Sequence, residues 1–310
     1  MAVTLVLRAL GLGDLLTAVP ALRALRAARP GDRIVLAAPA ALTPLAELTG
    51  AVDEVLPTSG LGELHLPGEP PALAVNLHGS GPESITDLLA TEPAELITHR
   101  HPDLPEVRGP AWREDVHEVR RWCDLLGSAG IPADPDDVGL PAPKVPNPAP
   151  GAVVLHPGAA FPSRRWPAHR FAAVARALAG HRVVVTGGAG EEGLAREVAE
   201  AAGLGEDAVL AGRTDLAALA AVIADAALVV CGDTGVGHLA TAFGTPSVLL
   251  FGPTPPSRWG PPVNRSRHKV LWAGRRGDPF ADRPDPGLLR LTEAEVLVAA
   301  RTLLPEATNA

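Results

Sequence analysis

The sequence predicts an α/β protein with two doubly wound parallel-sheet domains, and three observations lead to this. The chain has 310 residues, enough for two domains at about 150 residues each. Short β-branched or Leu-rich runs alternate with Ala/Leu/Arg-rich amphipathic stretches, the pattern of repeated βα units. The proline-rich run LPAPKVPNPAPG, residues 140–151, interrupts that alternation. We therefore expect domains at 1–145 and 146–310.

The first domain begins with a strand, a loop and a helix. Its strands are expected at 3–8, 33–37, 72–77 and 95–98. Its helices are expected at 15–28, 83–90 and 112–128. Pro20 lies inside the first helical stretch and should kink it or delay its start, because proline removes a backbone donor.

The same alternation restarts after the proline-rich run. Strands are expected at 152–156, 182–186, 208–210, 227–231 and 247–251. Helices are expected at 167–179, 191–201, 215–224 and 234–242. Residues 253–286 are rich in Pro, Arg, Trp and Gly, which predicts a long loop with one strand at 268–272. The last helix, 292–304, opens with Thr292 and Glu295 at capping-box spacing.

Composition excludes several classes of function. The formal net charge of -8 leaves no net basic field to hold a nucleic-acid backbone. Two cysteines provide no disulfide framework and fit a reducing cytoplasm. Residues 1–22 include Arg8 and Asp14 and lack a basic leading segment, so they do not indicate a secretory signal. No apolar run reaches the roughly 20 residues of a spanning helix, so we expect a cytoplasmic protein.

The first candidate site is RALGLGD, residues 8–14, between the first strand and the first helix. Gly13 lets a ligand approach the backbone, and Asp14 could act as a general base that the helix N-terminus keeps ionised. A plain helix N-cap is the alternative role of Asp14. A dinucleotide site is disfavoured, because Leu16 replaces the third fingerprint glycine and no acidic residue ends the second strand.

The second candidate site lies in CGDTGVGHLATAFGTP, residues 231–246, after a buried strand. Asp233, Thr234 and Gly235 form a strand-to-helix turn whose free amides could bind phosphate. His238 lies four residues after Thr234, on the same helical face, and could donate to a leaving-group oxygen. An Asp cap followed by a histidine satisfied in the core is the alternative.

The third and fourth candidates follow earlier strands of the second domain. Ser163, Arg164 and Arg165 precede a Trp-Pro helix start, where two cations favour a bound anion unless the turn is simply solvated. The run TGGAGEEG, residues 186–193, lacks the G-K-[ST] ending of an ATP-binding loop. Glu191 there could bind a ribose or cap the next helix.

Two further patterns are weaker. His99 and His101 lie two apart without companion ligands at metal spacing, so no metal site is expected. Arg23, Arg26 and Arg29 form a stripe on the first helix that could meet an acidic acceptor or an anionic membrane surface, although a solvated face is the simpler interpretation.

Together these motifs resemble glycosyltransferase family 9, the heptosyltransferases of bacterial envelope synthesis. The segments carrying the resemblance are VLRALGLGDLLTAVPALRALRAARP, RRWPAHRF and GDTGVGHLATAFGTPSVLLFGPTPPSRWGP. They occur in family order over residues 3–262. The resemblance implies a GT-B architecture, in which two Rossmann-like domains face a central cleft, with acceptor on the first and nucleotide-sugar on the second. It also allows the final helix to cross back to the first domain.

The resemblance also implies residue roles. Asp14 would activate the acceptor hydroxyl, and Thr214 lies in the region of the base pocket. Donor phosphate and sugar would be held by Asp233, Thr234, Gly235 and His238. Arg164 stands where the family often has lysine, which keeps the charge and changes a point donor into a planar fork.

The implied reaction is inverting transfer, without an obligatory cofactor or metal, from a nucleotide-sugar donor, with ADP and heptose preferred by resemblance only. The acceptor is a glycan or lipid-linked glycan, and the expected form is a monomer with peripheral contact at the inner membrane face. Two rivals stay open: a GT-B-fold nucleotide-sugar epimerase, which would turn over donor without acceptor, and a non-catalytic binding protein.

Overall fold

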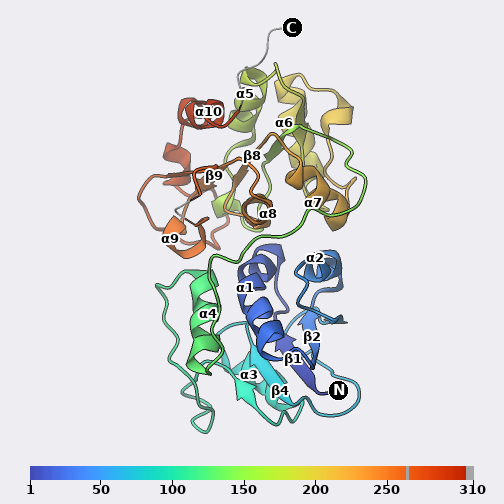
Figure 1. Ribbon diagram of the computed structural model, residues 1–310. Coiled ribbons are helices and arrows are strands. Elements are labelled where there is room, and N and C mark those ends of the chain that lie inside the picture. Colours follow the sequence, from blue (N-terminus) through green and yellow to red (C-terminus); the bar gives the residue numbers. More distant parts are fainter. Residues whose placement is uncertain (263–264, 305–310) are drawn as a thin grey trace. The chain divides into compact units, whose positions relative to one another are not determined.

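The computed structural model describes residues 1–262 and 265–304. The chain divides into two compact units, Met1–Leu140 and Pro141–Ala310. Each unit contains one parallel sheet flanked by helices (Figure 1). This confirms the predicted α/β class with two Rossmann-like layers. The division falls at the start of the proline-rich run, slightly before the expected boundary after residue 145.

The N-terminal unit has a five-stranded sheet in the order β3-β2-β1-β4-β5. Its strands are β1 (Val3–Leu7), β2 (Arg33–Ala38), β3 (Glu54–Pro57), β4 (Leu73–Asn76) and β5 (Leu96–Ile97). Its helices are α1 (Leu12–Ala28), α2 (Thr43–Leu48), α3 (Pro82–Leu89) and α4 (Glu118–Ser128). Leu5 and Leu7 pack on one face of β1, while Val6 between them is also fully buried. Both faces of this sheet are therefore covered, as in other doubly wound folds.

The C-terminal unit has the sheet order β10-β9-β8-β6-β7, again parallel throughout. Its strands are β6 (Val153–His156), β7 (Val183–Val185), β8 (Leu228–Gly232), β9 (Ser247–Phe251) and β10 (His268–Trp272). Its helices are α5 (Ala168–Ala177), α6 (Glu192–Ala202), α7 (Leu216–Ala224), α8 (Gly235–Phe243), α9 (Pro256–Trp259) and α10 (Glu293–Arg301).

The two faces of the second sheet take different helices. Val230 and Leu250 belong to the core shared with α5, α6 and α10. Side chains alternate along a strand, so the neighbouring Cys231 and Leu249 face the other way. There they meet α8 at Gly237, where an added Cβ would lie 3.1 Å from Leu249. The small residue lets the helix that carries His238 lie close against the sheet.

The structure corrects several predicted elements of the first unit. α1 begins at Leu12, earlier than expected, and continues through the buried Pro20, because the burial of all of residues 15–22 offsets the lost hydrogen bond. β3 and α2 were not predicted, since a four-residue edge strand and a six-residue helix are too short to display a period. α4 begins at Glu118 rather than residue 112, because His117 caps it by accepting from the Val119 amide at 3.3 Å.

One prediction in the second unit is also wrong. Residues 208–210 form no strand, and only a single bridge joins Val209 to Val185. The final helix packs on α5 and β9 of its own unit through Val296 and Ala300, and its crossing to the first domain stays a prediction. The strand predicted at 268–272 is confirmed as β10. Residues 263 and 264 of the predicted long loop lie outside the described residues, as do residues 305–310 of the predicted second domain.

Candidate donor and acceptor sites

Most of the candidate site residues lie at the carboxyl edge of one of the two sheets. In each sheet the strand order reverses beside its first strand: between β1 and β4 in the first, and between β6 and β8 in the second. Ligands of open α/β sheets bind outside the carboxyl ends of the strands at such a switch point. Asp14 follows β1 by one loop, and Asp233 follows β8 directly. Both candidate sites therefore lie at the switch point of their own sheet, Asp14 after its first strand and Asp233 after the strand beside the first.

Asp14 is held by a buried arginine. Arg8, which is 1% exposed, leaves the end of β1 and donates from Nε to the Asp14 carbonyl oxygen at 3.0 Å. Its Nη2 lies 3.4 Å from Asp14 Oδ1. Nη1 donates to the carbonyl of Leu77, which follows β4. The guanidinium thus joins both strands of the switch point and fixes the carboxylate on α1.

A second layer of charge lies behind Arg8. Glu118 on α4 accepts from Arg8 Nη2 at 3.3 Å and from Arg121 Nε at 3.0 Å. The Trp122 ring lies 4.7 Å from the Arg8 guanidinium carbon, and Trp122 is fully buried. This network was not predicted, because Glu118 is 110 residues from Arg8 and no local sequence pattern joins them. Arg8 itself could have been noticed as a cation ending a buried strand.

The structure corrects the N-cap role considered for Asp14. Gly11 is the N-cap of α1, and Asp14 sits three residues later and accepts from the Gly11 amide at 3.2 Å. Burial raises the pKa of Asp14, Arg8 opposes that rise, and Glu118 adds to it. That the helix N-terminus keeps the carboxylate ionised stays a prediction. Desolvation outweighs the favourable charges, which makes Asp14 a stronger base. Gly13 lies half-buried beside it in the first turn.

The second site is the turn between β8 and α8. Thr234, not Asp233, is the N-cap of α8, and within the described residues its side chain makes no capping hydrogen bond. The first amides of the helix, starting at Gly235, therefore lack the side-chain acceptor that often satisfies them. Asp233 is 7% exposed, and burial raises its pKa to about 6 against the opposing charge of Arg164. A buried acid beside helix amides suits hydroxyl and phosphate groups of one ligand.

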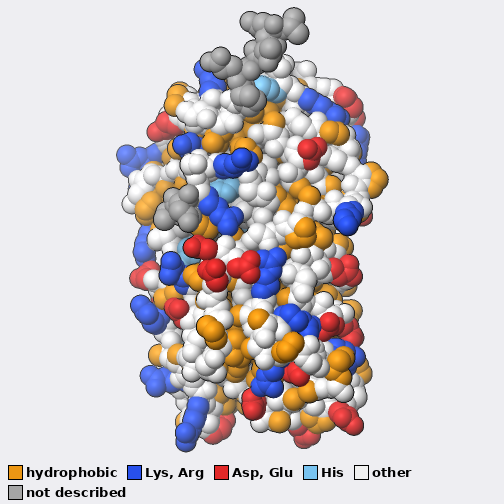
Figure 2. All heavy atoms as spheres, in the orientation of Figure 1, with side chains coloured by type: hydrophobic (Ala, Val, Ile, Leu, Met, Phe, Trp, Pro, Cys, Tyr) orange, Lys and Arg blue, Asp and Glu red, His pale blue; other side chains and the backbone are white. Residues whose placement is uncertain are grey.

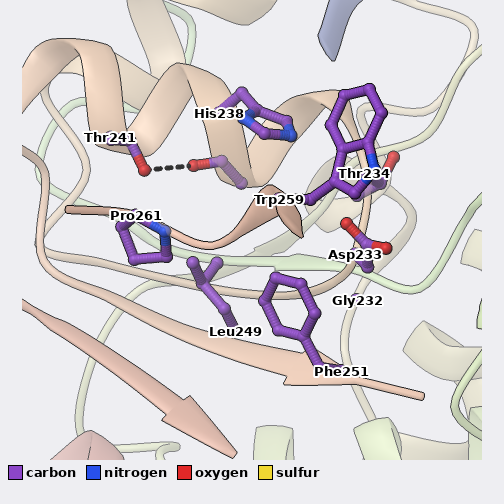
Figure 3. A pocket seen from close by; sticks show the side chains of 10 residues that line it. Gly232, Asp233, Thr234, His238, Thr241, Leu249, Phe251, Trp259 and Pro261 are labelled. Atoms are coloured by element: carbon purple, nitrogen blue, oxygen red, sulfur yellow. Dashed lines mark hydrogen bonds between the residues drawn. The ribbon is translucent and has the colours of Figure 1, made fainter. Parts of the chain in front are cut away.

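A pocket of about 210 Å³, including its open mouth, adjoins this turn. His238 on α8 and Trp259 at the end of α9 contact edge to face, with ring centroids 5.9 Å apart. Figure 3 shows Asp233, Thr234, His238 and Trp259 together at this pocket, with Leu249 and Phe251 below. Trp259 was not among the predicted site residues, although it lies in the matched C-terminal motif. The pocket combines a polar rim with an apolar and aromatic wall, as small-ligand sites do.

Arg164 reaches the same turn from the other side of the switch point. It ends η2 (Pro162–Arg164), and its backbone oxygen would lie 2.7 Å from a Cβ added to Gly232. Its Nε is buried without a hydrogen-bond partner among the described residues, and its guanidinium carbon lies 5.4 Å from the Phe161 ring centre. A buried guanidinium nitrogen without an acceptor fits the prediction that an anion binds here.

The neighbours of Arg164 have local partners. Ser163 is fully buried and donates to the Pro279 carbonyl at 2.8 Å, which anchors the loop of residues 277–286. This places its hydroxyl in the scaffold rather than toward a ligand. Arg165 donates from Nε to the Ala159 carbonyl at 2.9 Å. Of the three predicted residues, only Arg164 has an unpartnered buried donor.

Glu191 belongs to a cluster at the carboxyl ends of β6 and β7. It is the N-cap of α6, yet its carboxylate accepts from the Gly188 amide at 2.8 Å rather than capping the helix. Gly158 approaches it so closely that a Cβ would lie 2.3 Å from the carboxylate. His156 pairs through Nδ1 with the Thr186 hydroxyl at 3.0 Å, and its burial lowers its pKa to about 4. Thr214 is half-buried just before α7 and its proposed role in base binding stays a prediction.

The predicted basic stripe on α1 is neutralised within its own unit. Arg23 pairs with Asp137, Arg26 with Asp53, and Arg29 with Glu95. The stripe therefore gives no support to contact with a membrane or an acidic acceptor. On the face shown in Figure 2, acidic and basic side chains are interspersed.

The described residues also bear on metals and membranes. His99 packs against Trp112 at 5.1 Å, whereas His101 lies beside Asp103. Within residues 1–262 and 265–304, no three His, Cys, Asp or Glu side chains gather as a metal site would require. None of the helices in these same ranges combines the length and the apolar character needed to cross a bilayer.

The raised pKa of Asp233 predicts a dependence of stability on pH. The folded-state pKa of about 6 lies above the ordinary 3.8. The protonated Asp233 carboxyl therefore makes its full favourable contribution to the free energy of unfolding below pH 3.8, and this contribution is lost as the pH rises through 6. Asp233→Asn should therefore raise the free energy of unfolding at pH 7 by about 3 kcal/mol and have little effect at pH 3.5. Urea unfolding at both pH values measures this, with the exposed Asp282→Asn as control. An equal effect of Asp233→Asn at both pH values would contradict it.

Comparison with known proteins agrees with the family that the sequence motifs indicated. Residues 115–283 match glycosyltransferase family 9 (heptosyltransferase). Lipopolysaccharide heptosyltransferase 2 of Salmonella typhimurium is 33% identical over 160 residues, covering 48% of this chain and 46% of the relative. Lipopolysaccharide heptosyltransferase 1 of Pseudomonas aeruginosa is 36% identical over 160 residues, covering 48% and 43%. The matches thus span about half the length of these curated relatives.

Solved structures extend the likeness to both units. A glycosyl transferase family 9 protein from Veillonella parvula aligns with a TM-score of 0.78 and 21% identity, covering 97% of each chain. E. coli heptosyltransferase WaaC has been solved with ADP and with ADP-2-deoxy-2-fluoro heptose. It aligns with a TM-score of 0.71 in the ADP complex, at 20% identity over 97% of this chain and 99% of that one. These likenesses establish the GT-B fold, and since the family match covers more than half of the sequence, the chain belongs to glycosyltransferase family 9.

Proposed function

We propose that the protein transfers a heptose or similar sugar from ADP to a hydroxyl of a cell-envelope glycan, with inversion at the anomeric carbon. The observation that carries this is the pair of sites at the two switch points. One presents a half-buried carboxylate whose pKa is raised, and the other presents uncapped helix amides beside an unpartnered arginine donor. Membership of the family supports the reaction class, and the ADP complexes of a structural relative support the nucleotide.

The C-terminal unit would hold the donor. The amides at the start of α8 and the Arg164 guanidinium would bind the diphosphate, whose charge grows as the bond to the sugar breaks. Asp233 and His238 would take hydroxyls of the sugar or phosphate oxygens at the pocket rim. Glu191 lies where a ribose hydroxyl could reach a carboxylate. Arg164 and the helix amides supply the charge neutralisation that makes a divalent ion unnecessary in this proposal.

The N-terminal unit would supply the base. The acceptor oxygen attacks the anomeric carbon, its proton passes to the Asp14 carboxylate, and the bond from carbon to the diphosphate oxygen breaks with its electron pair leaving on ADP. Atoms and charge balance without a cofactor. A carboxyl whose pKa is raised by burial accepts this proton more readily than an exposed one. We place the reaction in the cytoplasm and the protein as a monomer that meets a glycan or lipid-linked acceptor.

Calorimetry with ADP, UDP and GDP tests the donor assignment. We expect ADP to bind at micromolar to low millimolar concentration and more tightly than the other two, because the proposal takes it as the leaving group. The titration is repeated with Arg164→Ala and with Arg176→Ala, which removes an exposed arginine of α5. Only Arg164→Ala should weaken binding. Absence of binding by all three nucleotides at millimolar concentration would contradict the proposed function.

A further inference from the structure

Three acceptors share the Nη2 nitrogen of Arg8. Nη2 carries two hydrogens, and three acceptors lie within reach: Thr17 Oγ1 at 3.1 Å, Glu118 Oε1 at 3.3 Å and Asp14 Oδ1 at 3.4 Å. Nη1 and Nε are directed to the Leu77 and Asp14 carbonyls. Asp14 therefore holds the longest of three shared contacts, not the bidentate pair that an arginine and a carboxylate form when unconstrained.

Glu118 in turn is shared between two arginines. Its Oε1 faces Arg8, and its Oε2 accepts from Arg121 Nε at 3.0 Å. Arg121 is fixed by the Arg113 carbonyl at 2.6 Å and stacks on Trp112 at 3.7 Å, and both arginines are at most 2% exposed. The side chains of Asp14, Arg8, Glu118 and Arg121 form a row of alternating charge. Asp14 is half-buried and the other three are buried, and the row ends on the Arg121 cation.

We propose that Glu118 is a positioning residue for the general base: by holding the Arg8 Nη2 group, it lets Arg8 orient the Asp14 carboxylate without pairing with it fully. The proposal rests on the proposed function, because it takes Asp14 as the base. A full ion pair would hold the carboxylate equally well and would make it a poor proton acceptor. The row thus lets Arg8 orient the Asp14 carboxylate while the carboxylate keeps its ability to accept a proton.

Two histidines are the other titratable groups near the row. The row itself comes from Arg8 after β1, Asp14 in α1, and Glu118 and Arg121 on α4. His78 follows β4, and burial together with Arg8 lowers its pKa, so it is neutral at pH 7. His99 lies beside the two tryptophans and its pKa is lowered in the same way, with Arg121 contributing. Burial is the largest cause of the raised pKa of Asp14, and among the charges of the row Arg8 opposes that rise and Glu118 adds to it.

Two substitutions should move that titration in opposite directions. Glu118→Gln removes a negative charge and frees Arg8 for Asp14, so the pKa of Asp14 should fall by about 1 unit. Arg121→Gln leaves Glu118 with Arg8 alone, which weakens the hold of Arg8 on Asp14, so the pKa of Asp14 should rise. A purely structural role of either residue gives no reason for shifts of opposite sign.

Carboxyl-carbon NMR of the full chain, labelled at aspartate and titrated with pH, measures these shifts, with Asp14→Asn to assign the signal. Thr17→Val provides a variant that changes no charge and removes one competitor for Nη2. It should lower the pKa of Asp14 by less than Glu118→Gln does, and it keeps the test decisive if a charge variant fails to fold. Thermal unfolding checks each variant, and the exposed Asp124→Asn serves as control.

The acid limb of kcat/KM for sugar transfer should move with the titration of Asp14: to lower pH in Glu118→Gln and Thr17→Val, and to higher pH in Arg121→Gln. A titration that is unmoved in the folded variants, or moved the same way by Glu118→Gln and Arg121→Gln, would overturn the inference. A wild-type protein that transfers no sugar would overturn the proposed function instead, and because NMR needs no turnover, the two failures are distinguishable.

Discussion

Asp14→Asn is expected to reduce kcat for sugar transfer by about 10²- to 10⁴-fold, the range for loss of a general base, while the Kd for ADP stays unchanged. Asparagine keeps the size and can still accept from the Gly11 amide, but it cannot take the acceptor proton. Because Asp14 lies in the N-terminal unit and the donor site in the C-terminal unit, its loss should not affect nucleotide binding. Steady-state kinetics and calorimetry on the same preparation measure both quantities.

The matched control is Asp124→Asn, an exposed aspartate of α4 in the same unit. It should transfer sugar at the wild-type rate. If Asp14→Asn retained wild-type kcat, or if Asp124→Asn lost as much, the assignment of Asp14 as the base would be wrong. The binding-protein hypothesis predicts no sugar transfer by the wild type or by either variant, since it assigns Asp14 no chemical step.

Arg164→Ala is expected to reduce kcat by about 10²- to 10³-fold and to weaken ADP binding, because it removes a preorganised donor to the departing diphosphate. Because its buried Nε has no hydrogen-bond partner, the desolvation penalty of Arg164 is already present in the free protein and is not added when the diphosphate binds. Arg164→Lys should recover part of the rate, since it restores the charge without the planar fork. The assay is run in a chelator, so that no adventitious divalent ion replaces the lost cation.

Arg176→Ala is the control for Arg164→Ala, because Arg176 is an exposed arginine of the same unit whose contact is the Ala201 carbonyl. Wild-type kinetics are expected for it. If Arg164→Ala left kcat and ADP affinity unchanged, the assignment of Arg164 to the donor site would be wrong. If the wild-type rate depended on added divalent ion, the proposal that Arg164 and the α8 amides neutralise the diphosphate charge by themselves would be wrong.

The fold could be predicted from the sequence wherever a run was long enough to show a period. β1, β8 and β9 were found within one residue at each end, because buried parallel strands are continuous apolar runs. β3 was missed because it is a short edge strand with exposed ends, Glu54 and Pro57. α1 was expected to bend at Pro20 or to start later, yet it begins at Leu12, because the burial of its apolar side chains outweighed the local cost. The bend at Pro20 stays a prediction. Tertiary packing, which the sequence does not display locally, decided these cases.

The site residues were likewise predictable only where a local sequence motif contained them. Asp14, Asp233 and His238 lie in contiguous motifs at strand-to-helix turns, so residue type and spacing were enough to select them. Glu118 and Arg121 come from α4, distant in sequence from the loop they support, and only the fold brings them to Arg8. Ser163 was selected because it neighbours Arg164, but its hydroxyl faces the loop at Pro279. Sequence motifs identified the residues proposed to touch ligand, and the structure added those that hold them.

The measurement that tests the central claim most directly is product analysis with ADP-heptose and heptose-deficient lipooligosaccharide. Mass spectrometry detects the added sugar, and the one-bond carbon–proton coupling at the new anomeric centre reports its configuration. We predict that the acceptor gains one heptose with the anomeric configuration inverted relative to the donor, and that the Asp14→Asn protein forms no such product. Retention of configuration, or conversion of the donor without any acceptor, would contradict the account.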